Sequence, residues 1–210
     1  MHEPLVDIGN RYAHLYLDGK VFDLSYDELF AQFSHRKIFY ICVNNSLRDL
    51  LSQNSLWIDI EPFIEIKGSY RGMGIDRQVV LLSRGDGIYI DAGSAITIDK
   101  IVEDEYQGGI ILPGVWSMIK SYAQISPILE IESLDRVDLC KLPKSNTRNT
   151  ISYGIIAPIV AFVEKINSEG LPIYCCGGDG ERVSGYMQSA IYSKELVFEG
   201  MNKVVKECGC

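Results

Sequence analysis

The stretch Leu5-Val6-Asp7-Ile8-Gly9-Asn10 sets an apolar run directly before a turn made of small and polar residues. The same pattern returns at Ile88-Tyr89-Ile90-Asp91-Ala92-Gly93-Ser94, where Asp91 lies 84 residues after Asp7 (91 − 7). Short apolar runs that stop at such turns are typical of β-strands. One Asp-x-Gly alone is a common turn, but its return at a matching place predicts two related halves.

The segments around the first loop alternate between strand and helix patterns. Residues 13–17, followed by Asp18-Gly19-Lys20, predict a strand that enters a hairpin turn. From there to residue 83 we expect helices at 26–33, 47–51 and 76–83, and strands at 37–43 and 59–66.

The strongest break in the chain is Arg84-Gly85-Asp86-Gly87, and we expect a domain boundary there, between a first domain at 1–84 and a second at 85–210. The second half repeats the opening and then changes to alternating helices and strands. Its expected strands are 88–90, 95–102, 106–112, 172–176 and 196–198, and its expected helices are 115–124, 147–166, 181–191 and a last one from 199. This order predicts an α/β fold made of two related domains.

The formal net charge of −8 argues against nucleic acids and anionic membranes as partners, because such surfaces are held mainly by Lys and Arg. The first residues lack the basic and apolar regions of a signal peptide, and no uninterrupted apolar run reaches membrane-spanning length. We therefore expect a soluble cytoplasmic protein. Its six cysteines, which lack the spacing of a zinc site, are expected to be reduced, with a redox or metal role of Cys208-Gly209-Cys210 as the alternative.

The two repeated loops have the residues needed to hold phosphate. Glycine lets backbone N–H groups approach phosphate oxygens closely, and an adjacent carboxylate can hold a metal ion that neutralises them. Asn10 and Ser94 add hydrogen-bond donors. A third glycine loop, Gly177-Gly178-Asp179-Gly180, follows an expected strand and could seat the adenosine part of a nucleotide, although alone it is only a loop.

The segment Gly74-Ile75-Asp76-Arg77 stands at an expected helix start. Asp76 there could simply cap the helix, since the dipole favours an acid at that end. Its functional interpretation is that Asp76 accepts the proton of an attacking hydroxyl while Arg77 holds a substrate carboxylate.

Together these segments resemble the type III pantothenate kinases of the acetate and sugar kinase/heat-shock/actin superfamily. Further matching segments are Asp91-Ala92-Gly93-Ser94-Ala95-Ile96-Thr97-Ile98-Asp99, Tyr106-Gln107-Gly108-Gly109-Ile110-Ile111-Leu112-Pro113-Gly114, Asn146-Thr147 and Cys176-Gly177-Gly178-Asp179. The resemblance implies two actin-like (ribonuclease H-like) domains, each a mixed sheet flanked by helices, with the nucleotide cleft between them. It also implies ATP-dependent phosphorylation of pantothenate to 4′-phosphopantothenate, the first step of coenzyme A biosynthesis, by a homodimer that uses magnesium and potassium or ammonium.

Roles follow by position from the same resemblance. Asp76 would be the general base, Asp91 the ligand of the monovalent cation, and Ser94 a nucleotide contact. Gly74, Ile75, Arg77 and Tyr70 would contact pantothenate, and Thr147 would do so across the dimer. The first phosphate loop would be Asp7-Ile8-Gly9-Asn10-Arg11-Tyr12-Ala13-His14, with Asp7 near the magnesium; Gly177 and Gly178 would bind the nucleotide, and the second domain would carry the dimer interface.

Three departures separate the chain from the family pattern. Arg11 stands where the family usually has Thr, Ser94 replaces Thr, and the chain is shorter than typical members. The spacing between Tyr70 and the Gly-x-Asp-Arg segment is also shortened. Two other functions stay open: a non-catalytic regulatory protein that keeps the fold, and a kinase of the same superfamily acting on another hydroxyl compound. The apolar helical face at 155–163 favours core packing over a dimer surface.

Overall fold

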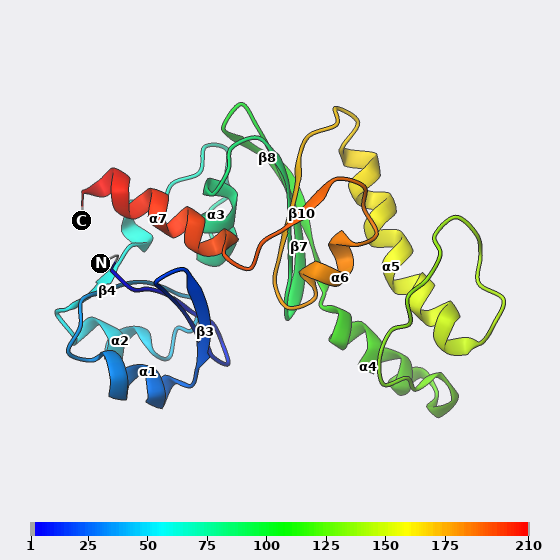
Figure 1. The fold of residues 1–210 in the computed structure, drawn as a ribbon, viewed down its shortest axis with the longest axis horizontal. Coiled ribbons are helices and arrows are strands. Elements are labelled where there is room, and N and C mark those ends of the chain that lie inside the picture. Colours follow the sequence, from blue (N-terminus) through cyan, green and yellow to red (C-terminus); the bar gives the residue numbers. More distant parts are fainter. Residues whose placement is uncertain (1–2, 210) are drawn as a thin grey trace. The chain divides into compact units, whose positions relative to one another are not determined.

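The computed structural model describes residues 3–209 and contains two mixed sheets of five strands each (Figure 1). Packing divides the chain into two compact units. Unit 1 contains the chain up to Gly85, residues 103–106 and the chain from Lys194 on; unit 2 contains Asp86–Val102 and Gln107–Ser193.

The sheet of unit 1 has the strand order β3-β2-β1-β4-β5. Strand β1 pairs antiparallel with β2 and parallel with β4, while β3 continues the antiparallel side and β5 the parallel side. Its strands are β1 Leu5–Ile8, β2 Ala13–Leu17, β3 Lys20–Leu24, β4 Ile38–Cys42 and β5 Trp57–Asp59. Its helices are α1 Tyr26–Phe33, α2 Arg48–Ser52, the 3-10 turn η1 Glu61–Phe63, α3 Ile75–Leu82 and α7 Leu196–Cys208.

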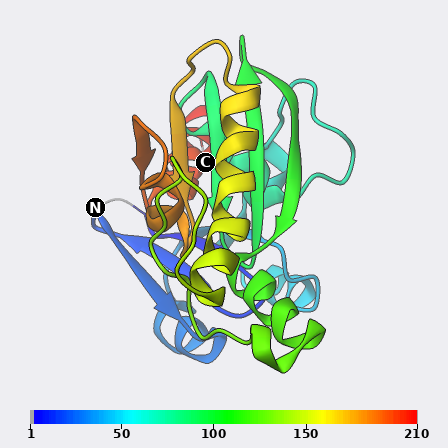
Figure 2. The same ribbon diagram turned by 90° about the vertical axis from the view of Figure 1, so that its right-hand side faces the viewer.

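The sheet of unit 2 has the order β10-β9-β6-β7-β8, and α5 lies across one of its faces (Figure 2). Its strands are β6 Gly87–Ala92, β7 Ala95–Val102, β8 Glu105–Pro113, β9 Ile173–Cys176 and β10 Ala190–Tyr192. Its helices are α4 Val115–Ile125, the 3-10 turn η2 Pro127–Leu129, α5 Thr147–Ile166 and α6 Gly180–Ser184.

The two sheets have the same topology. In each, the first strand of the unit is central, pairs antiparallel with the next strand, and pairs parallel with a strand that comes after a helix. Asp7 and Asp91 are the penultimate residues of these central strands, β1 and β6. The predicted α/β fold of two related halves is therefore confirmed.

Three expected elements are wrong. The strand expected at 59–66 ends at Asp59, because the side chain of Asp59 accepts the N–H of Glu61 (2.9 Å) and Pro62 has no N–H for a sheet. The helix expected at 181–191 ends at Ser184, and β10 follows as an edge strand beside β9. The strand expected at 196–198 is the first turn of α7.

The helix α7 belongs to unit 1, where it packs against α3 and β1. Its buried residues Leu196, Gly200 and Val204 recur at every fourth position and so form one helical face. The packing units thus differ from the expected division at residue 84 in the placement of residues 103–106 and of the chain from Lys194 on.

The apolar face of α5 lies in the core of unit 2, as the sequence favours. Ile155, Ile156, Ile159, Val160 and Val163 are buried there against the sheet. By length and composition α5 is also the one helix among residues 3–209 that could cross a membrane, a test that buried core helices of soluble proteins pass as well.

The described cysteines differ in their state. Cys42, Cys140, Cys175 and Cys176 are free thiols, as expected. Cys208 is disulfide-bonded, which corrects the expectation of a reduced thiol at this position. Cys210 lies outside the described residues.

Candidate functional site

The first loop joins β1 to β2 and is closed by a short turn. The N–H of Gly9 donates to the carbonyl of Tyr12 (3.0 Å). The hydroxyl of Tyr26, the first residue of α1, donates to the carbonyl of Gly9 (2.7 Å), and the side-chain amide of Asn44 donates to that hydroxyl (3.2 Å). Tyr26 and Asn44 therefore fix the loop beside the half-buried Asp7.

The remaining residues of the expected phosphate loop differ in exposure. Asn10, Arg11 and Tyr12 are exposed, so their side chains can meet a ligand from solvent. Ala13 is buried in β2, and His14 lies directly opposite Asp7 in the antiparallel register. Opposite residues of such a pair share one face of the sheet. The ring of His14 is in turn held by a carboxylate oxygen of Asp23 on β3 (2.6 Å).

A second carboxyl group, Asp59, ends β5 at the edge of the sheet where β1 also ends. The strands β1, β4 and β5 are parallel, so their carboxyl ends meet there. Burial raises the pKa of Asp59, although the N–H of Glu61 opposes the shift. Burial also raises the pKa of Cys42, at the end of β4. Carboxyl groups with a perturbed pKa are frequent at functional sites, and the sequence alone gave no sign of this one.

The second loop lies in unit 2, where the structure brings Asp91 together with Gly177. Asp91, the penultimate residue of β6, lies beside Cys176 of β9 in the parallel register. A Cβ atom added to Gly177 would lie 2.5 Å from a carboxylate oxygen of Asp91, and Gly177 has a φ of +82°. Only glycine fits such a position without displacing the backbone or the carboxylate.

Further backbone bonds join the same loops. The N–H of Asp179 donates to the carbonyl of Ala92 (2.9 Å), and the N–H of Gly93 donates to the carbonyl of Ala95 (2.9 Å). Ser94 is exposed, while its carbonyl accepts the N–H of Gly114 before α4 (3.1 Å). The loops after β6 and β9 and the start of α4 thus form one cradle, with Gly178 exposed at its surface.

The segment Gly74-Ile75-Asp76-Arg77 opens α3 in unit 1. Gly74 is the N-cap residue, so Asp76 lies within the first turn and does not occupy the capping position. A carboxylate oxygen of Asp76 accepts the N–H of Arg77 (2.8 Å), which holds this half-buried side chain at the helix start. Ile75 is buried and anchors the segment to the core.

Arg77 is the one buried cationic side chain in the described part of the chain, with 6% of its surface exposed. Its guanidinium donates to the hydroxyls of Tyr70 (2.8 Å) and Tyr106 (3.0 Å). Its central carbon lies 5.9 Å from the centre of each ring, within the range of cation–π attraction. The sequence analysis assigns no role to Tyr106. It could have been noticed there, because it begins the segment Tyr106-Gln107-Gly108-Gly109, which matches the family pattern.

Thr147 is the first residue of α5 and is exposed. The helix start is fixed by its N-cap residue Asn146, whose side-chain oxygen accepts the N–H of Asn149 (2.8 Å). Thr147 belongs to unit 2, whereas the Gly74-Ile75-Asp76-Arg77 segment belongs to unit 1.

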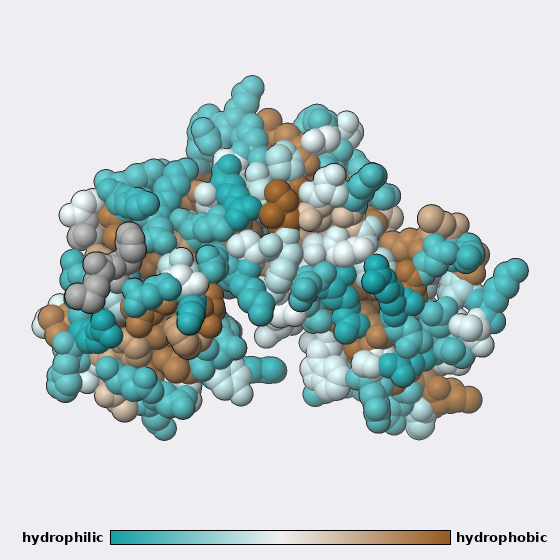
Figure 3. Space-filling view, viewed as in Figure 1, coloured by the Kyte–Doolittle hydropathy of each residue, from teal (hydrophilic) through white to brown (hydrophobic). Residues whose placement is uncertain are grey.

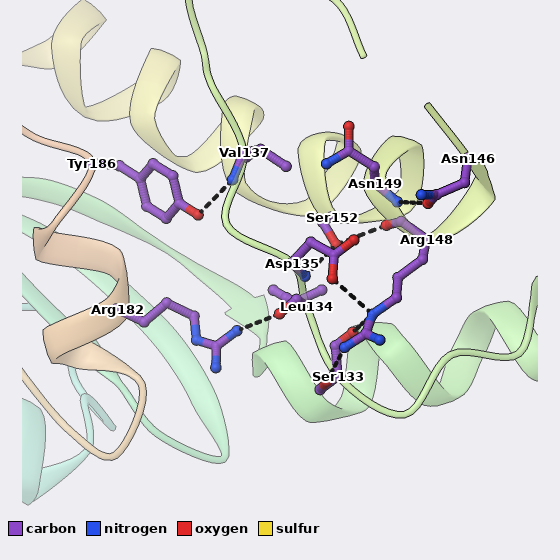
Figure 4. A network of polar contacts seen from close by, with 10 residues as sticks. All are labelled: Ser133, Leu134, Asp135, Val137, Asn146, Arg148, Asn149, Ser152, Arg182 and Tyr186. Atoms are coloured by element: carbon purple, nitrogen blue, oxygen red, sulfur yellow. Dashed lines mark hydrogen bonds and ion pairs between the residues drawn. The ribbon is translucent and has the colours of Figure 1, made fainter. Parts of the chain in front are cut away.

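A hollow of about 350 Å³ lies beside α6 in unit 2. One wall is the irregular segment after η2, and the other is the exposed side of α6, which follows the Gly177-Gly178 loop directly. The lining residues are Leu134, Asp135, Arg136, Glu181, Arg182, Gly185 and Tyr186. Figure 4 shows the polar contacts that hold the first wall in place. The sequence does not reveal this hollow, because one wall has no regular periodicity.

Residues 3–209 contain no group of three or more His, Cys, Asp or Glu side chains arranged to hold a metal ion. Asp7 and Asp91 each offer carboxylate oxygens next to backbone N–H groups, which suits hard cations that take their other ligands from water and phosphate. The donor chemistry therefore fits magnesium bound together with a nucleotide.

Comparison with known proteins identifies the family. The model of the type III pantothenate kinase family matches residues 43–169. The chain is 40% identical over 203 residues to a type III pantothenate kinase of Campylobacter jejuni, covering 97% of this chain and 96% of the relative. It is 37% identical to that of Wolinella succinogenes, with the same coverage of both chains.

Solved structures agree with the fold. A crystal structure from Campylobacter jejuni, described as a Baf family transcriptional activator, has a TM-score of 0.85 at 39% identity and covers 98% of both chains. A Sinorhizobium meliloti protein assigned as a 2-dehydro-3-deoxygalactonokinase has a TM-score of 0.58 at 11% identity, over 98% of this chain and 96% of its own. The predicted pair of actin-like domains is confirmed, and the chain belongs to the type III pantothenate kinases.

Proposed function

We propose that this kinase transfers the γ-phosphoryl group of ATP to the primary hydroxyl of pantothenate, which makes 4′-phosphopantothenate in the first step of coenzyme A biosynthesis. The observation that carries the proposal is Arg77. In a chain of net charge −8, this buried guanidinium, held between two tyrosines, is a suitable partner for the carboxylate of pantothenate. The near full-length similarity to curated type III pantothenate kinases supports the same substrate.

Asp76 is the proposed general base. It follows the N-cap Gly74 by two residues and precedes Arg77, so a substrate held by Arg77 has a carboxylate beside it. Phosphoryl transfer needs mainly alignment and charge neutralisation, and a base need only accept the hydroxyl proton as the new bond forms. The bond from the N–H of Arg77 keeps the Asp76 carboxylate in place before substrate arrives.

The nucleotide is proposed to bind through the two repeated loops. The backbone of residues 7–14 and the hydroxyl of Ser94 would contact the phosphates, with Asp7 on the magnesium and Asp91 on potassium or ammonium. These cations, when bound, neutralise negative charge on the phosphates. Gly177 and Gly178 would lie under the ribose, and the hollow beside α6 has a volume that suits a nucleobase.

Arg11 is where this chain departs from its family in the phosphate loop. The residue is exposed, so its guanidinium can reach solvent-side phosphate oxygens where the family usually offers a hydroxyl. We expect Arg11→Thr to be active. Its affinity for ATP should depend less on ionic strength than that of the wild type, because salt screens the attraction between an exposed guanidinium and phosphate.

The enzyme is proposed to work as a cytoplasmic homodimer in which Thr147 contacts pantothenate in the partner's site. Exposure of Thr147 at the start of α5 permits this. Apolar side chains exposed in unit 2 at Ile111, Trp116, Ile125 and Ile128 offer the surface. Figure 3 shows apolar side chains at the lower right, over the region of α4 and η2.

The deciding experiment measures 4′-phosphopantothenate formed from ATP and pantothenate with sodium, potassium and ammonium salts in parallel. Product that increases with potassium or ammonium supports the proposal, and absence of product beside an active control enzyme contradicts it. A panel of other hydroxyl compounds tests the alternative of another substrate.

Asp76→Asn separates catalysis from a purely regulatory, nucleotide-binding role. Loss of a general base typically costs about 10²–10⁴ in rate, while ATP binding should stay within about twofold, because the carboxylate does not line the nucleotide hollow. Asp49→Asn, an exposed acid on α2, is the matched control. Full turnover by Asp76→Asn would exclude Asp76 as the base.

A further inference from the structure

Arg148, the residue after Thr147, makes three polar contacts with a segment that lies 13 to 15 residues before it. Its Nε donates to the carbonyl of Ser133 (3.0 Å) and lies 3.0 Å from a carboxylate oxygen of Asp135. Its Nη2 donates to the hydroxyl of Ser133. The guanidinium thus binds this segment through backbone and side chain together (Figure 4).

The same helical turn adds a second attachment. Ser152 is fully buried; its hydroxyl accepts the N–H of Asp135 (2.9 Å) and donates to the carbonyl of Arg148 (2.7 Å). From the other side, Arg182 of α6 donates to the carbonyl of Leu134 (3.2 Å), and the hydroxyl of Tyr186 accepts the N–H of Val137 (3.2 Å). A segment without helix or strand is therefore fixed at successive backbone groups.

This segment is one wall of the hollow beside α6, because Leu134, Asp135 and Arg136 line it. The side chain of Leu134 is also buried in the core of unit 2. Apart from the packing of Leu134, the wall is held by polar contacts from α5 and α6, since no sheet or helix bond holds residues 133–136. Among these contacts, Arg148 supplies the only cation that pairs with Asp135 in the described residues.

We propose that Arg148 is a positioning residue for ATP binding. By holding Ser133 and Asp135 against α5, Arg148 sets the width of the hollow beside α6. The inference rests on the proposed placement of the nucleobase in this hollow. The hydrogen bonds and the ion pair of the Arg148 side chain described above go to Ser133 and Asp135, and the start of α5 is capped separately by Asn146. Its loss therefore acts on the nucleoside part of ATP and leaves the phosphate and pantothenate contacts in place.

The test compares Arg148→Met and Arg148→Lys with the wild type. Lys141→Met is the matched control, because Lys141 is an exposed cation on the same irregular segment whose ion pair is with Asp138, three residues before it. Calorimetry measures the dissociation constants of ATP and of inorganic tripolyphosphate, both with magnesium. Tripolyphosphate has the phosphate chain but no nucleoside.

We expect Arg148→Met to weaken ATP binding about 5- to 20-fold, the range for a partly exposed guanidinium that holds several acceptors. The dissociation constant of tripolyphosphate and the KM for pantothenate should stay within about twofold of the wild-type values. The affinity of Arg148→Lys for ATP should lie between those of Arg148→Met and the wild type, because an ammonium group cannot make the parallel hydrogen bonds of a guanidinium. Equal weakening of ATP and tripolyphosphate would show a general structural effect and overturn the proposal, as would unchanged ATP binding.

Asp135→Asn keeps the size of the side chain and one oxygen acceptor but removes the charge. It tests the same ion pair from the other partner, in case the arginine variants fail to fold. It should weaken ATP selectively, by less than Arg148→Met. These binding measurements need no turnover. If the protein formed no phosphopantothenate, the proposed reaction would be wrong, but the binding measurements would still test the role of Arg148.

Discussion

At the scale of single residues, the site depends on contacts that sequence spacing does not reveal. Arg77 and Tyr106 are 29 positions apart, yet the hydroxyl of Tyr106 accepts a bond from Arg77. The motif around Arg77 could be predicted because its residues are contiguous and have a recognisable order. Its contact with Tyr106 could not, since that contact becomes visible only once residues 103–106 are placed in the same unit as α3.

Tyr106→Phe removes this acceptor and keeps the ring beside the guanidinium. We expect the KM for pantothenate to rise roughly three- to tenfold, with kcat little changed, because the net contribution of one hydrogen bond is about 0.5–1.5 kcal/mol and the ring attraction remains. Steady-state kinetics measure both constants. Tyr153→Phe, which removes a hydroxyl on α5 far from Arg77 in sequence, is the control, and an unchanged KM for Tyr106→Phe would remove this tyrosine from the site.

Asp59→Asn is expected to stabilise the protein at neutral pH. Burial raises the pKa of Asp59 above the unfolded value of 3.8, with the N–H of Glu61 opposing the shift. The folded state therefore holds its proton more tightly, so this contribution to stability is complete below pH 3.8 and is lost as pH rises through the folded pKa. At pH 7.5 the buried charge is a penalty that asparagine removes, while its side-chain oxygen can still accept from Glu61.

Thermal unfolding at pH 7.5 and at pH 4 checks the sign of this effect. The Tm of Asp59→Asn should exceed that of the wild type at pH 7.5, and the difference should shrink at pH 4. Asp49→Asn provides an exposed acid for comparison. A gain of equal size at both pH values would mean that the charge of Asp59 is not its cause.

At the scale of elements, strands and helices with clear periodicity follow from the sequence. The bounds of β2, α1, β7 and α5 are as predicted. The errors occur where short apolar runs fit both periods, as at Leu196-Val197-Phe198, which has the pattern of a strand but starts a helix. The apolar face of α7 packs against α3 and β1, and these partners, distant in sequence, decided the outcome.

Gly200→Ala tests the contact between α7 and α3. A Cβ atom on Gly200 would lie 1.9 Å from the carbonyl oxygen of Val79, so the two helices would have to separate. Overpacking of this kind costs about 1–3 kcal/mol or more, which outweighs the better helix propensity of alanine. We expect a Tm lower by several degrees in a thermal melt, with Lys203→Ala on the exposed face of α7 close to wild type.

The bidentate ion pair between Arg84 and Glu199 (2.6 and 2.5 Å) also joins the end of α3 to α7. It is partly exposed, so we expect its loss in Arg84→Met to matter less than Gly200→Ala. If Gly200→Ala melted at the wild-type temperature, α7 would not be held as closely to α3 as the structure has it.

At the scale of the whole molecule, the proposed homodimer requires an exposed apolar surface. The apolar face of α5 is buried in the core of unit 2, so it cannot also be the dimer surface. Large apolar side chains remain exposed near α4, with 71% of Ile125 and 81% of Ile128 accessible. The turn η2 packs against α4, which brings these two side chains into one region. Exposed apolar residues that gather in this way mark interaction surfaces.

Ile128→Glu is therefore expected to weaken the proposed homodimer, because a charge would have to be desolvated at the interface. Sedimentation equilibrium should show a shift from twice the chain mass toward the chain mass. Because Thr147 is proposed to reach the partner's site, specific activity should fall at low protein concentration and recover as concentration drives the variant back to a dimer.

Phe63→Glu is the matched control: it places the same charge at a side chain that is 52% exposed in unit 1, where no dimer surface is proposed. It should sediment and react like the wild type. If Ile128→Glu left the dimer unaffected, the proposed interface would have to be assigned to another surface of unit 2. Dissociation without loss of activity would instead show that each chain carries a complete site, and Thr147 would then have no role across the interface.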